Sequence, residues 1–228
     1  LAPKDQPRNS PPNKKSIIVS SMDEELNRSL NWIDDQFIRY IFCSITDTVY
    51  FFIGEFKRTG GVTDLVRAFI KINNKIKDTK LLLVGGGYSY NECISLANQS
   101  DARNNIIFEK RIPYKYIRTY QDLADIIVCP DRDNSFSRMI IHLKVWDALS
   151  SNKIVLCSGF KPILEINKDE KLFVNFKPSS LKSLEEKLIY VFENKSSLLK
   201  KFSTNRNYVE NNFTYSSINS NLLKIFSN

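Results

Sequence analysis

The sequence lacks any run of about 18 consecutive apolar residues, the minimum length for a helix that crosses a membrane. Its first residues, LAPKDQPRNSPPNKK, also lack the apolar stretch of a secretory signal. We therefore expect a cytoplasmic protein. Histidine occurs once, and no pair of cysteines has C-x-x-C spacing, so we expect neither disulfides nor a zinc site.

Several motifs of nucleotide binding and catalysis are absent as well. The sequence has no G-x-S-x-G nucleophile elbow, no Walker lysine and no G-x-G-x-x-G fingerprint. The 33 Lys and Arg residues outnumber the 25 Asp and Glu residues, and the net charge of +8 suits a polyanion, a phosphorylated ligand or an anionic membrane surface. The basic residues are spread along the chain without an arginine-rich stripe, so we do not expect binding of nucleic acid.

The residues that are present divide the chain into two parts. Residues 1–47 begin with a stretch rich in Pro and Asn, and they then contain one helix, in which apolar residues recur at spacings of three and four. We interpret this part as a linker or appendage. Residues 48–228 alternate between strand and helix patterns, and we predict that they form one domain.

Short apolar runs alternate with helical patterns throughout the second part. The expected strands cover residues 49–54, 79–87, 104–110, 125–130, 153–158 and 171–176. Because parallel strands need crossovers of about a dozen residues or more, the alternation predicts an α/β fold, a Rossmann-like parallel sheet with helices on both faces. A loop with Pro162 and Glu165 is expected after the fifth strand, and the C-terminus is expected to be helical, with helices over residues 181–193, 196–210 and 215–227.

The loops after the first two strands are candidates for a ligand site. In an open parallel sheet, ligands bind beyond the carboxyl ends of the strands, near the point where the strand order reverses. GEFKRTGG (residues 54–61) and VGGG (residues 84–87) carry glycines at a helix entrance, where free N–H groups favour a phosphate. Lys57 and Arg58 add positive charge to the first loop. The alternative is that these glycines only form tight turns.

One segment near the end of the sheet pattern pairs an acid with a base. IHLKVWDALSSNKIVLC, residues 141–157, begins as an amphipathic helix and ends as a buried strand, and it places Lys144 and Asp147 three residues apart on one helix face. A carboxylate in this position can accept hydrogen bonds from a ligand at the edge of the sheet. The alternative is an ordinary ion pair on an exposed face. His142 has no catalytic partner that the spacing identifies, and we interpret it as a structural residue.

Five segments, taken in order, resemble one protein family. They are FFIGEFKRTGGVTDLVRAF, LLLVGGG, IIFEKRIPYKYIRTYQDLADIIVCP, IHLKVWDALSSNKIVLCS and FTYSSINSNLLKIF. The first resembles G-x-x-x-x-x-K-G-V-x-x-L-x-x-A-F, the second L-x-L-V-G-x-G, and the fourth P-x-K-x-x-E-Y-M-A-x-G-K-P-V-V-x-S. From about Val49 to the C-terminus, this order resembles the C-terminal, nucleotide-sugar-binding domain of retaining glycosyltransferases of the GT-B fold, in the group called glycosyl transferases family 1 or GT4.

The resemblance implies a single GT-B C-terminal half that binds a UDP-, GDP- or ADP-sugar and supports retaining transfer of a hexose, with neither a metal ion nor another cofactor. It assigns no catalytic residue. The donor-binding residues that it implies are Lys57, Arg58, Gly60, Gly61, Gly86, Arg111, Ile112, Tyr114, Lys144 and Asp147. In this scheme the base contacts residues 111–114, the ribose contacts Asp147, and the diphosphate contacts the two lysines, Arg58 and the loop amides around Gly86.

The chain also departs from the family pattern. Glu55 and Gly60 stand where the family usually has an arginine and a lysine for the diphosphate, Asp147 replaces a glutamate, and Met139 replaces the first acid of an E-x7-E pair. These departures leave open a non-catalytic, degenerate GT-B-like binding or scaffold module. Residues 1–47 are too few for an acceptor-binding domain, so the implied partner is a separate N-terminal domain or chain. Relatives with membrane acceptors further imply peripheral association with a membrane.

Overall fold

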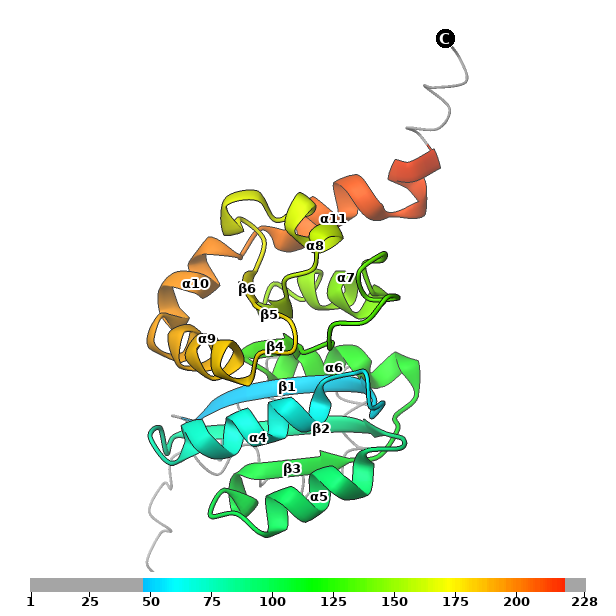
Figure 1. Ribbon diagram of the computed structural model, residues 1–228. Coiled ribbons are helices and arrows are strands. Elements are labelled where there is room, and N and C mark those ends of the chain that lie inside the picture. The colour runs from blue at the N-terminus through cyan, green and yellow to red at the C-terminus, as the bar shows by residue number, and fades with distance from the viewer. Residues whose placement is uncertain (1–46, 220–228) are drawn as a thin grey trace, which may run out of the picture. The chain divides into compact units, whose positions relative to one another are not determined.

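The computed structural model describes residues 47–219, which form a six-stranded sheet with the order β3-β2-β1-β4-β5-β6 (Figure 1). Every strand runs parallel to its neighbours. The strands are β1 (Thr48–Glu55), β2 (Thr79–Gly86), β3 (Ile106–Glu109), β4 (Ile126–Cys129), β5 (Ile154–Ser158) and β6 (Val174–Phe176). The predicted parallel α/β sheet is therefore confirmed.

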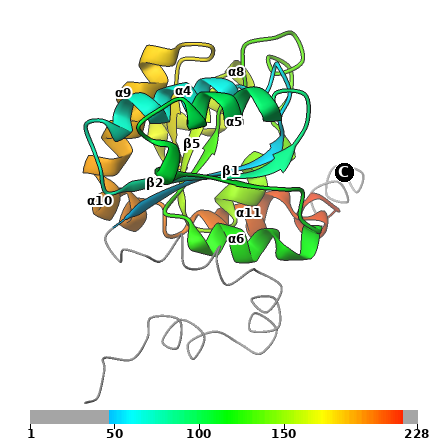
Figure 2. The ribbon, with the colours of Figure 1, turned by 90° about the horizontal axis from the view of Figure 1, so that it is seen from below.

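Helices cover both faces of the sheet, as predicted. The α-helices are α4 (Val62–Asn73), α5 (Tyr90–Asn98), α6 (Ile117–Leu123), α7 (Leu143–Leu149), α8 (Lys161–Ile166), α9 (Leu181–Glu193), α10 (Lys195–Lys201) and α11 (Asn205–Phe213), and single 3-10 turns form η1 (Arg103–Asn105), η2 (Tyr114–Tyr116) and η3 (Lys168–Glu170). Helices α4, α5 and α9 lie on one face, and α6 and α11 lie on the other (Figure 2). No helix within residues 47–219 has the length and apolarity to span a membrane.

The order of the strands determines where a ligand site can form. The chain builds the sheet outward from β1 to β3, and then returns to the other side of β1 and continues from β4 to β6. The strand order therefore reverses between β1 and β4. At such a point the following loops diverge to opposite sides of the sheet and leave a crevice at the carboxyl ends of the strands.

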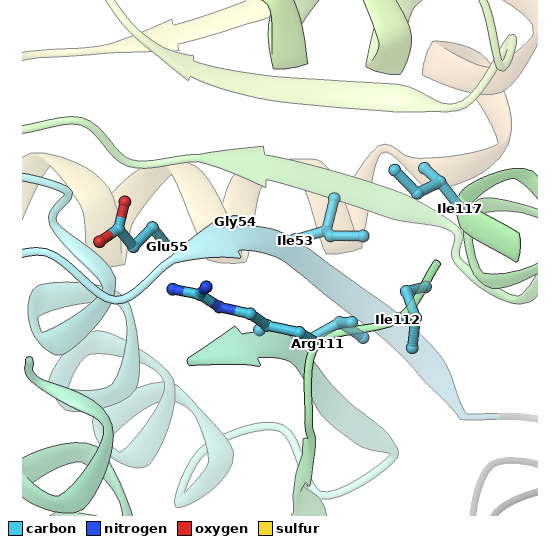
Figure 3. Close-up of a pocket in the computed structure, with 8 residues that line it drawn as sticks. Ile53, Gly54, Glu55, Arg111, Ile112 and Ile117 are labelled. Carbon is cyan, nitrogen blue, oxygen red and sulfur yellow. The ribbon is translucent and has the colours of Figure 1, made fainter. Parts of the chain in front are cut away.

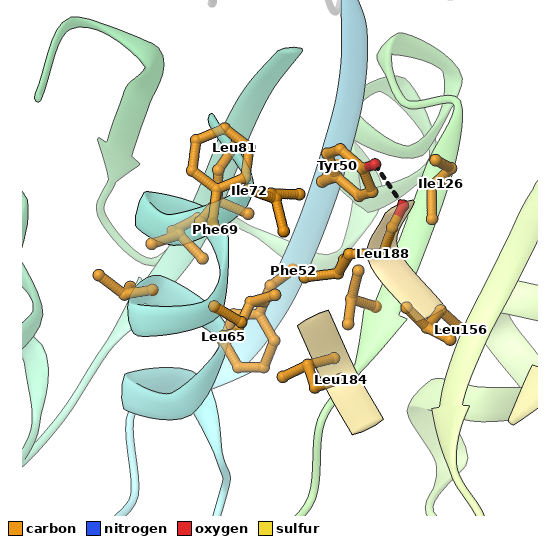
Figure 4. Close-up of a cluster of buried hydrophobic side chains, with 14 of the residues drawn as sticks. Tyr50, Phe52, Leu65, Phe69, Ile72, Leu81, Ile126, Leu156, Leu184 and Leu188 are labelled. Carbon is orange, nitrogen blue, oxygen red and sulfur yellow. Dashed lines mark hydrogen bonds between the residues drawn. The ribbon is translucent and has the colours of Figure 1, made fainter. Parts of the chain in front are cut away.

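The central strand β1 is buried on both faces, which explains its continuous apolar sequence. Tyr50 and Phe52 face α4 and α9, where they pack with Leu65, Phe69 and Leu188 (Figure 4). The Tyr50 hydroxyl donates a hydrogen bond of 2.7 Å to the Leu188 carbonyl oxygen, so the phenol has a partner inside the core. Burial raises the pKa of Tyr50 far above its ordinary value, and the hydroxyl stays protonated.

Two segments differ from the prediction. The helix expected over residues 196–210 is interrupted between α10 and α11, because the buried side chain of Asn205 donates to the Leu172 carbonyl oxygen at 2.6 Å and ties the start of α11 to the segment before β6. The loop expected around Pro162 contains the short helix α8. Proline fits its first turn, where a backbone N–H would have no intrahelical acceptor.

Two expected helices fall wholly or partly outside the described residues. The helix of the appendage lies within residues 1–46. The last helix, expected over residues 215–227, is described for residues 215–219, and these are helical. The described cysteines are free and buried, and Cys129 and Cys157 lie opposite each other on β4 and β5.

The hydroxyl of Ser158, at the end of β5, is fully buried and has no hydrogen-bond partner within residues 47–219. A buried hydroxyl without a partner loses its bonds to water and gains nothing in exchange. We expect Ser158→Ala to raise the free energy of unfolding by about 1 kcal/mol in urea denaturation. The control is Ser151→Ala, since the buried Ser151 hydroxyl donates to the Ala148 carbonyl at 2.5 Å and its loss should be destabilising. Equal losses in both variants would contradict the prediction.

Candidate functional site

The loop from β1 to α4 packs directly on the loop from β4 to α7. Gly61 has a φ of 66°, and a Cβ at this position would lie 1.6 Å from the Pro130 carbonyl oxygen. No other residue fits without moving one of the loops. The Arg132 amide donates to the Thr59 carbonyl oxygen at 3.0 Å. The two loops on either side of the reversal in strand order are therefore joined.

The side chain of Arg132 strengthens this junction. Its guanidinium donates to both carboxylate oxygens of Asp64, at 2.6 and 2.5 Å, and to the Arg58 carbonyl oxygen at 3.0 Å. The hydrogen bonds to Asp64 raise the pKa of Arg132 above its ordinary value. Asp64 lies in the first turn of α4, where a negative charge also interacts favourably with the helix dipole. This pair was not predicted from the sequence.

We expect Arg132→Gln and Asp64→Asn each to lower the free energy of unfolding by about 1 kcal/mol, because a bidentate pair is stronger than a single contact but is here partly screened by solvent. The double variant should cost little more than either single variant, since both remove the same interaction. Urea denaturation measures all three. Arg138→Gln is the control, because its pair with Asp133 is exposed and should contribute little. If the double variant lost as much stability as the two single variants together, the inferred interaction between Arg132 and Asp64 would be contradicted.

Lys144, in the first turn of α7, is paired with an acid from the preceding loop. Its ammonium lies 2.7 Å from a carboxylate oxygen of Asp131, whose side chain is 9% exposed. The same ammonium lies 5.8 Å from the centre of the Phe52 ring, near the carboxyl end of β1. The ordinary ion pair between Lys144 and Asp147, which the sequence analysis gave as the alternative to a ligand contact, does not form. The partner of the lysine is Asp131 instead.

Asp147 lies one turn further along α7 and is half-buried. Within the described residues, its carboxylate makes no hydrogen bond or ion pair; only its backbone carbonyl accepts one, from the Ser150 hydroxyl. Burial raises the pKa of Asp147 above its ordinary value of 3.8. A half-buried carboxylate without a partner in the domain has its oxygens available to a ligand.

His142 immediately precedes α7 and has structural contacts. Its ring meets the Phe136 ring edge-on at a centroid distance of 5.7 Å, and its Nε2 lies 3.3 Å from the Ser137 hydroxyl. Burial lowers the pKa of His142 below 6.5; the carboxylate of Asp131 opposes this effect, and the charge of Lys144 adds to it. The imidazole is therefore neutral at pH 7. These contacts agree with the structural interpretation of this residue.

A cavity of about 300 Å³ opens at the carboxyl ends of β1 and β2 (Figure 3). Its size falls at the lower end of the range for small-molecule sites. Gly85 has a φ of 140°, and a Cβ there would lie 2.0 Å from the Gly54 carbonyl oxygen, so the two strand ends are in close contact. The residues that line the cavity are Ile53, Gly54, Glu55, Val84, Gly85, Arg111, Ile112 and Ile117.

The cavity has apolar walls and a charged rim. Four of the lining side chains are aliphatic, and the charged ones are Glu55 and Arg111. Arg111 extends from the loop after β3 along the end of β2 toward the turn of β1 (Figure 3). A Cβ on Gly86 would lie 4.0 Å from the Arg111 Nε, so the arginine passes over a residue that has no side chain.

The two cations predicted in the loop after β1 both have nearby partners. The Lys57 ammonium lies 3.1 Å from a carboxylate oxygen of Glu55. The Arg58 guanidinium lies over the ring of Tyr88, with its Cζ 4.0 Å from the ring centre, and it also contacts the Tyr88 hydroxyl. Neither Lys57 nor Arg58 lines the cavity.

The structure therefore separates the predicted donor-binding residues into groups. Arg111 and Ile112 line the cavity, and Gly86 lies beside it. Gly60 and Gly61 belong to the joined loops, as do Lys57 and Arg58, while Lys144 and Asp147 lie on α7. Tyr114 is 76% exposed and does not line the cavity.

Sequence reasoning missed three of the four aliphatic walls of the cavity, Ile53, Val84 and Ile117. Ile53 alternates with the core residue Phe52 along β1 and so faces the opposite side of the sheet, where Ile117 of α6 also lies. The alternation of side chains in a strand was a usable signal for Ile53. The placement of Ile117 depends on how α6 packs, and nothing in the local sequence specifies that.

The sheet is parallel, its strand order reverses between β1 and β4, and a cavity lies beside the glycine turns at its carboxyl edge. These features define the class of Rossmann-like α/β domains with a ligand site at that edge. The family model described as "Glycosyl transferases group 1" matches residues 44–209. The chain belongs to this family.

Solved structures share this fold. The C-terminal domain of a glycosyl transferase group 1 family protein (LpcC) from Francisella tularensis has a TM-score of 0.64 at 20% identity, over 78% of this chain and 92% of that one. Anabaena Alr3699/HepE in complex with UDP has a TM-score of 0.71 at 12% identity, over 90% of this chain and 53% of that one. A glycosyltransferase from Rickettsia africae gives 0.70 at 17% identity, over 94% and 54%. The chain thus spans about half the length of the latter two. No curated protein matches it in sequence.

Proposed function

We propose that the chain is the donor-binding half of a glycosyltransferase, which binds a nucleotide sugar and supports retaining transfer of a hexose. The observation that carries the proposal is the cavity at the carboxyl ends of β1 and β2, which has aliphatic walls and lies beside the reversal in strand order. The UDP in the structure of Alr3699/HepE, which has the same fold, supports this choice of ligand class.

The roles of the residues follow from their chemistry. The base packs between the aliphatic walls, where Ile112 and Ile117 are partly buried. The ribose hydroxyls donate to the carboxylate of Asp147, which has no other partner within residues 47–219. The diphosphate lies at the glycine turns, where backbone N–H groups can donate to its oxygens. Protein cations balance its charge, and the proposal includes no metal ion or other cofactor.

The acceptor is bound by a separate domain or chain. The proximity of donor and acceptor supplies much of the rate of a transfer reaction, so the donor half by itself is expected to bind the nucleotide sugar and to transfer little. We place the protein in the cytoplasm, with peripheral association at an anionic membrane surface when its acceptor is membrane-bound. The excess of positive charge supports this location.

Calorimetric titration of the full chain with UDP, GDP and ADP tests the proposal. One of the three is expected to bind with a micromolar Kd. If none binds, the alternative applies, a non-catalytic module that has kept the fold and lost the phosphate site. One observation favours this alternative: the acidic residue Glu55 belongs to the lining of the cavity in which a diphosphate would have to fit.

A further inference from the structure

We propose that Arg111 binds the diphosphate of the donor, in place of Lys57 and Arg58 in the loop after β1, and that it does not contact the base. This inference rests on the proposed function, because it assigns the phosphate end of the same site. It also changes the role that the sequence suggested for Arg111, which was a contact to the base.

The other basic side chains around the site already have partners. Lys57 is 3.1 Å from Glu55, Lys144 is 2.7 Å from Asp131, and Arg58 stacks on Tyr88. Arg132 is held by Asp64 through two hydrogen bonds. If a diphosphate drew Lys57, Lys144 or Arg132 away from its partner, the carboxylate left behind would be unpaired. Arg58 would have to leave the ring of Tyr88 instead.

Arg111, in contrast, has no such partner within residues 47–219. It makes no ion pair and no side-chain hydrogen bond to any residue of the described part of the chain, and it is exposed. It lines the cavity together with Gly54 and Gly85, the glycines at the ends of β1 and β2. Its side chain extends toward the turn of β1 rather than toward Ile112 and Ile117 (Figure 3).

The position of the guanidinium fits a phosphate. It lies over Gly86, whose missing side chain leaves room beside the Nε. A guanidinium presents several N–H donors in a planar fork that matches the geometry of phosphate oxygens. Gly54 and Gly85 line the same cavity, so the arginine and the glycine turns can contact one ligand group together.

Glu55 makes the charge of Arg111 necessary. Glu55 belongs to the lining of the same cavity and pairs with Lys57, so the two side chains together offer a diphosphate no net positive charge. Glu55→Gln removes the negative charge and releases Lys57. The affinity for nucleoside diphosphate should then increase, by about threefold to tenfold. This change is opposite in sign to the loss expected on removal of Arg111.

The experiment compares a nucleoside diphosphate with its nucleoside. The full chain is titrated with UDP, GDP or ADP, whichever binds most tightly, by calorimetry, and with the matching nucleoside by NMR, which reaches millimolar Kd values. Arg111→Gln is expected to weaken binding of the diphosphate by about tenfold to 100-fold, because it removes charge-assisted hydrogen bonds. The Kd of the nucleoside should change by less than about twofold. Arg111→Lys is expected to restore part of the loss.

The neighbouring Lys110 provides a matched control. It is exposed and carries the same charge, but it does not line the cavity, so Lys110→Gln should leave both affinities nearly unchanged. Equal losses in the two glutamine variants would show a general effect of net charge and would overturn the inference. Parallel losses of nucleoside and diphosphate in Arg111→Gln would also overturn it and assign the arginine to the base. If the unmodified chain binds none of the three diphosphates, the proposed function itself fails.

Discussion

Replacing Gly61 by alanine is expected to destabilise the domain by about 4 kcal/mol or more, a large part of the 5–15 kcal/mol that is typical of folded proteins. The new Cβ would lie 1.6 Å from the Pro130 carbonyl oxygen, far inside contact distance. The overlap is with backbone, so it cannot be relieved by rotating a side chain. The left-handed φ of 66° adds a further cost of about 1 kcal/mol for any residue with a Cβ.

The measurement is urea or thermal denaturation followed by circular dichroism. Gly60→Ala is the matched control in the same loop, because its nearest neighbours would lie 3.4 Å from the new Cβ, which is ordinary contact. We expect this control to change stability by less than about 1 kcal/mol. If Gly61→Ala unfolded at the same denaturant concentration as Gly60→Ala, the close approach of the two loops would be wrong.

Replacing Asp147 by alanine is expected to weaken binding of nucleoside diphosphate by about 100-fold or more. The proposed function gives its carboxylate two hydrogen bonds from the ribose, and bonds to a charged group contribute about 1.5–3 kcal/mol each. The loss should appear for the nucleoside as well as for the diphosphate, which distinguishes Asp147 from Arg111. Calorimetry and NMR titration of the same ligands measure it. Glu186→Ala, on the exposed face of α9, removes one negative charge elsewhere and should have no effect.

The stability of an Asp147 variant should change in the opposite direction. Burial raises the pKa of this carboxyl above 3.8, so the ionised form is disfavoured in the folded protein. The contribution of this carboxyl group to the free energy of unfolding is fully present below pH 3.8, and it is lost as the pH rises through the higher pKa of the folded protein. At pH 7, Asp147→Asn should therefore be at least as stable as the unmodified chain, and the difference should shrink as the pH falls. A variant that loses both binding and stability at pH 7 would point to a structural role.

Patterns along the chain were sufficient to predict the parallel sheet. The strand β1 is buried on both faces and therefore reads as a continuous apolar run, and the glycines after β1 and β2 mark strand ends that touch each other. These features can be predicted from the sequence, because the burial of a strand and its backbone conformation limit which residue types occur at each position. The same is true of α7, which lies in the first part of residues 141–157, where an amphipathic helix was expected.

The pairing of charges could not be predicted in this way. The sequence placed Lys144 and Asp147 on one helix face and left an ion pair between them as an alternative, but the lysine pairs with Asp131, which lies 13 positions earlier. Arg132 likewise reaches Asp64 across 68 positions. Such partners depend on how loops from different strands meet at the sheet edge. The interruption before α11 has a similar origin, since it follows from the hydrogen bond of Asn205 to a distant segment.

The central claim is that a nucleotide binds at the carboxyl edge of β1 and β2, and hydrogen–deuterium exchange with and without nucleoside diphosphate tests it most directly. The account predicts slower exchange of amides in residues 54–61, 85–88 and 111–117 when the ligand is present, and unchanged exchange in α9 and α10. Protection confined to α9 and α10, or no protection anywhere at a saturating ligand concentration, would contradict it.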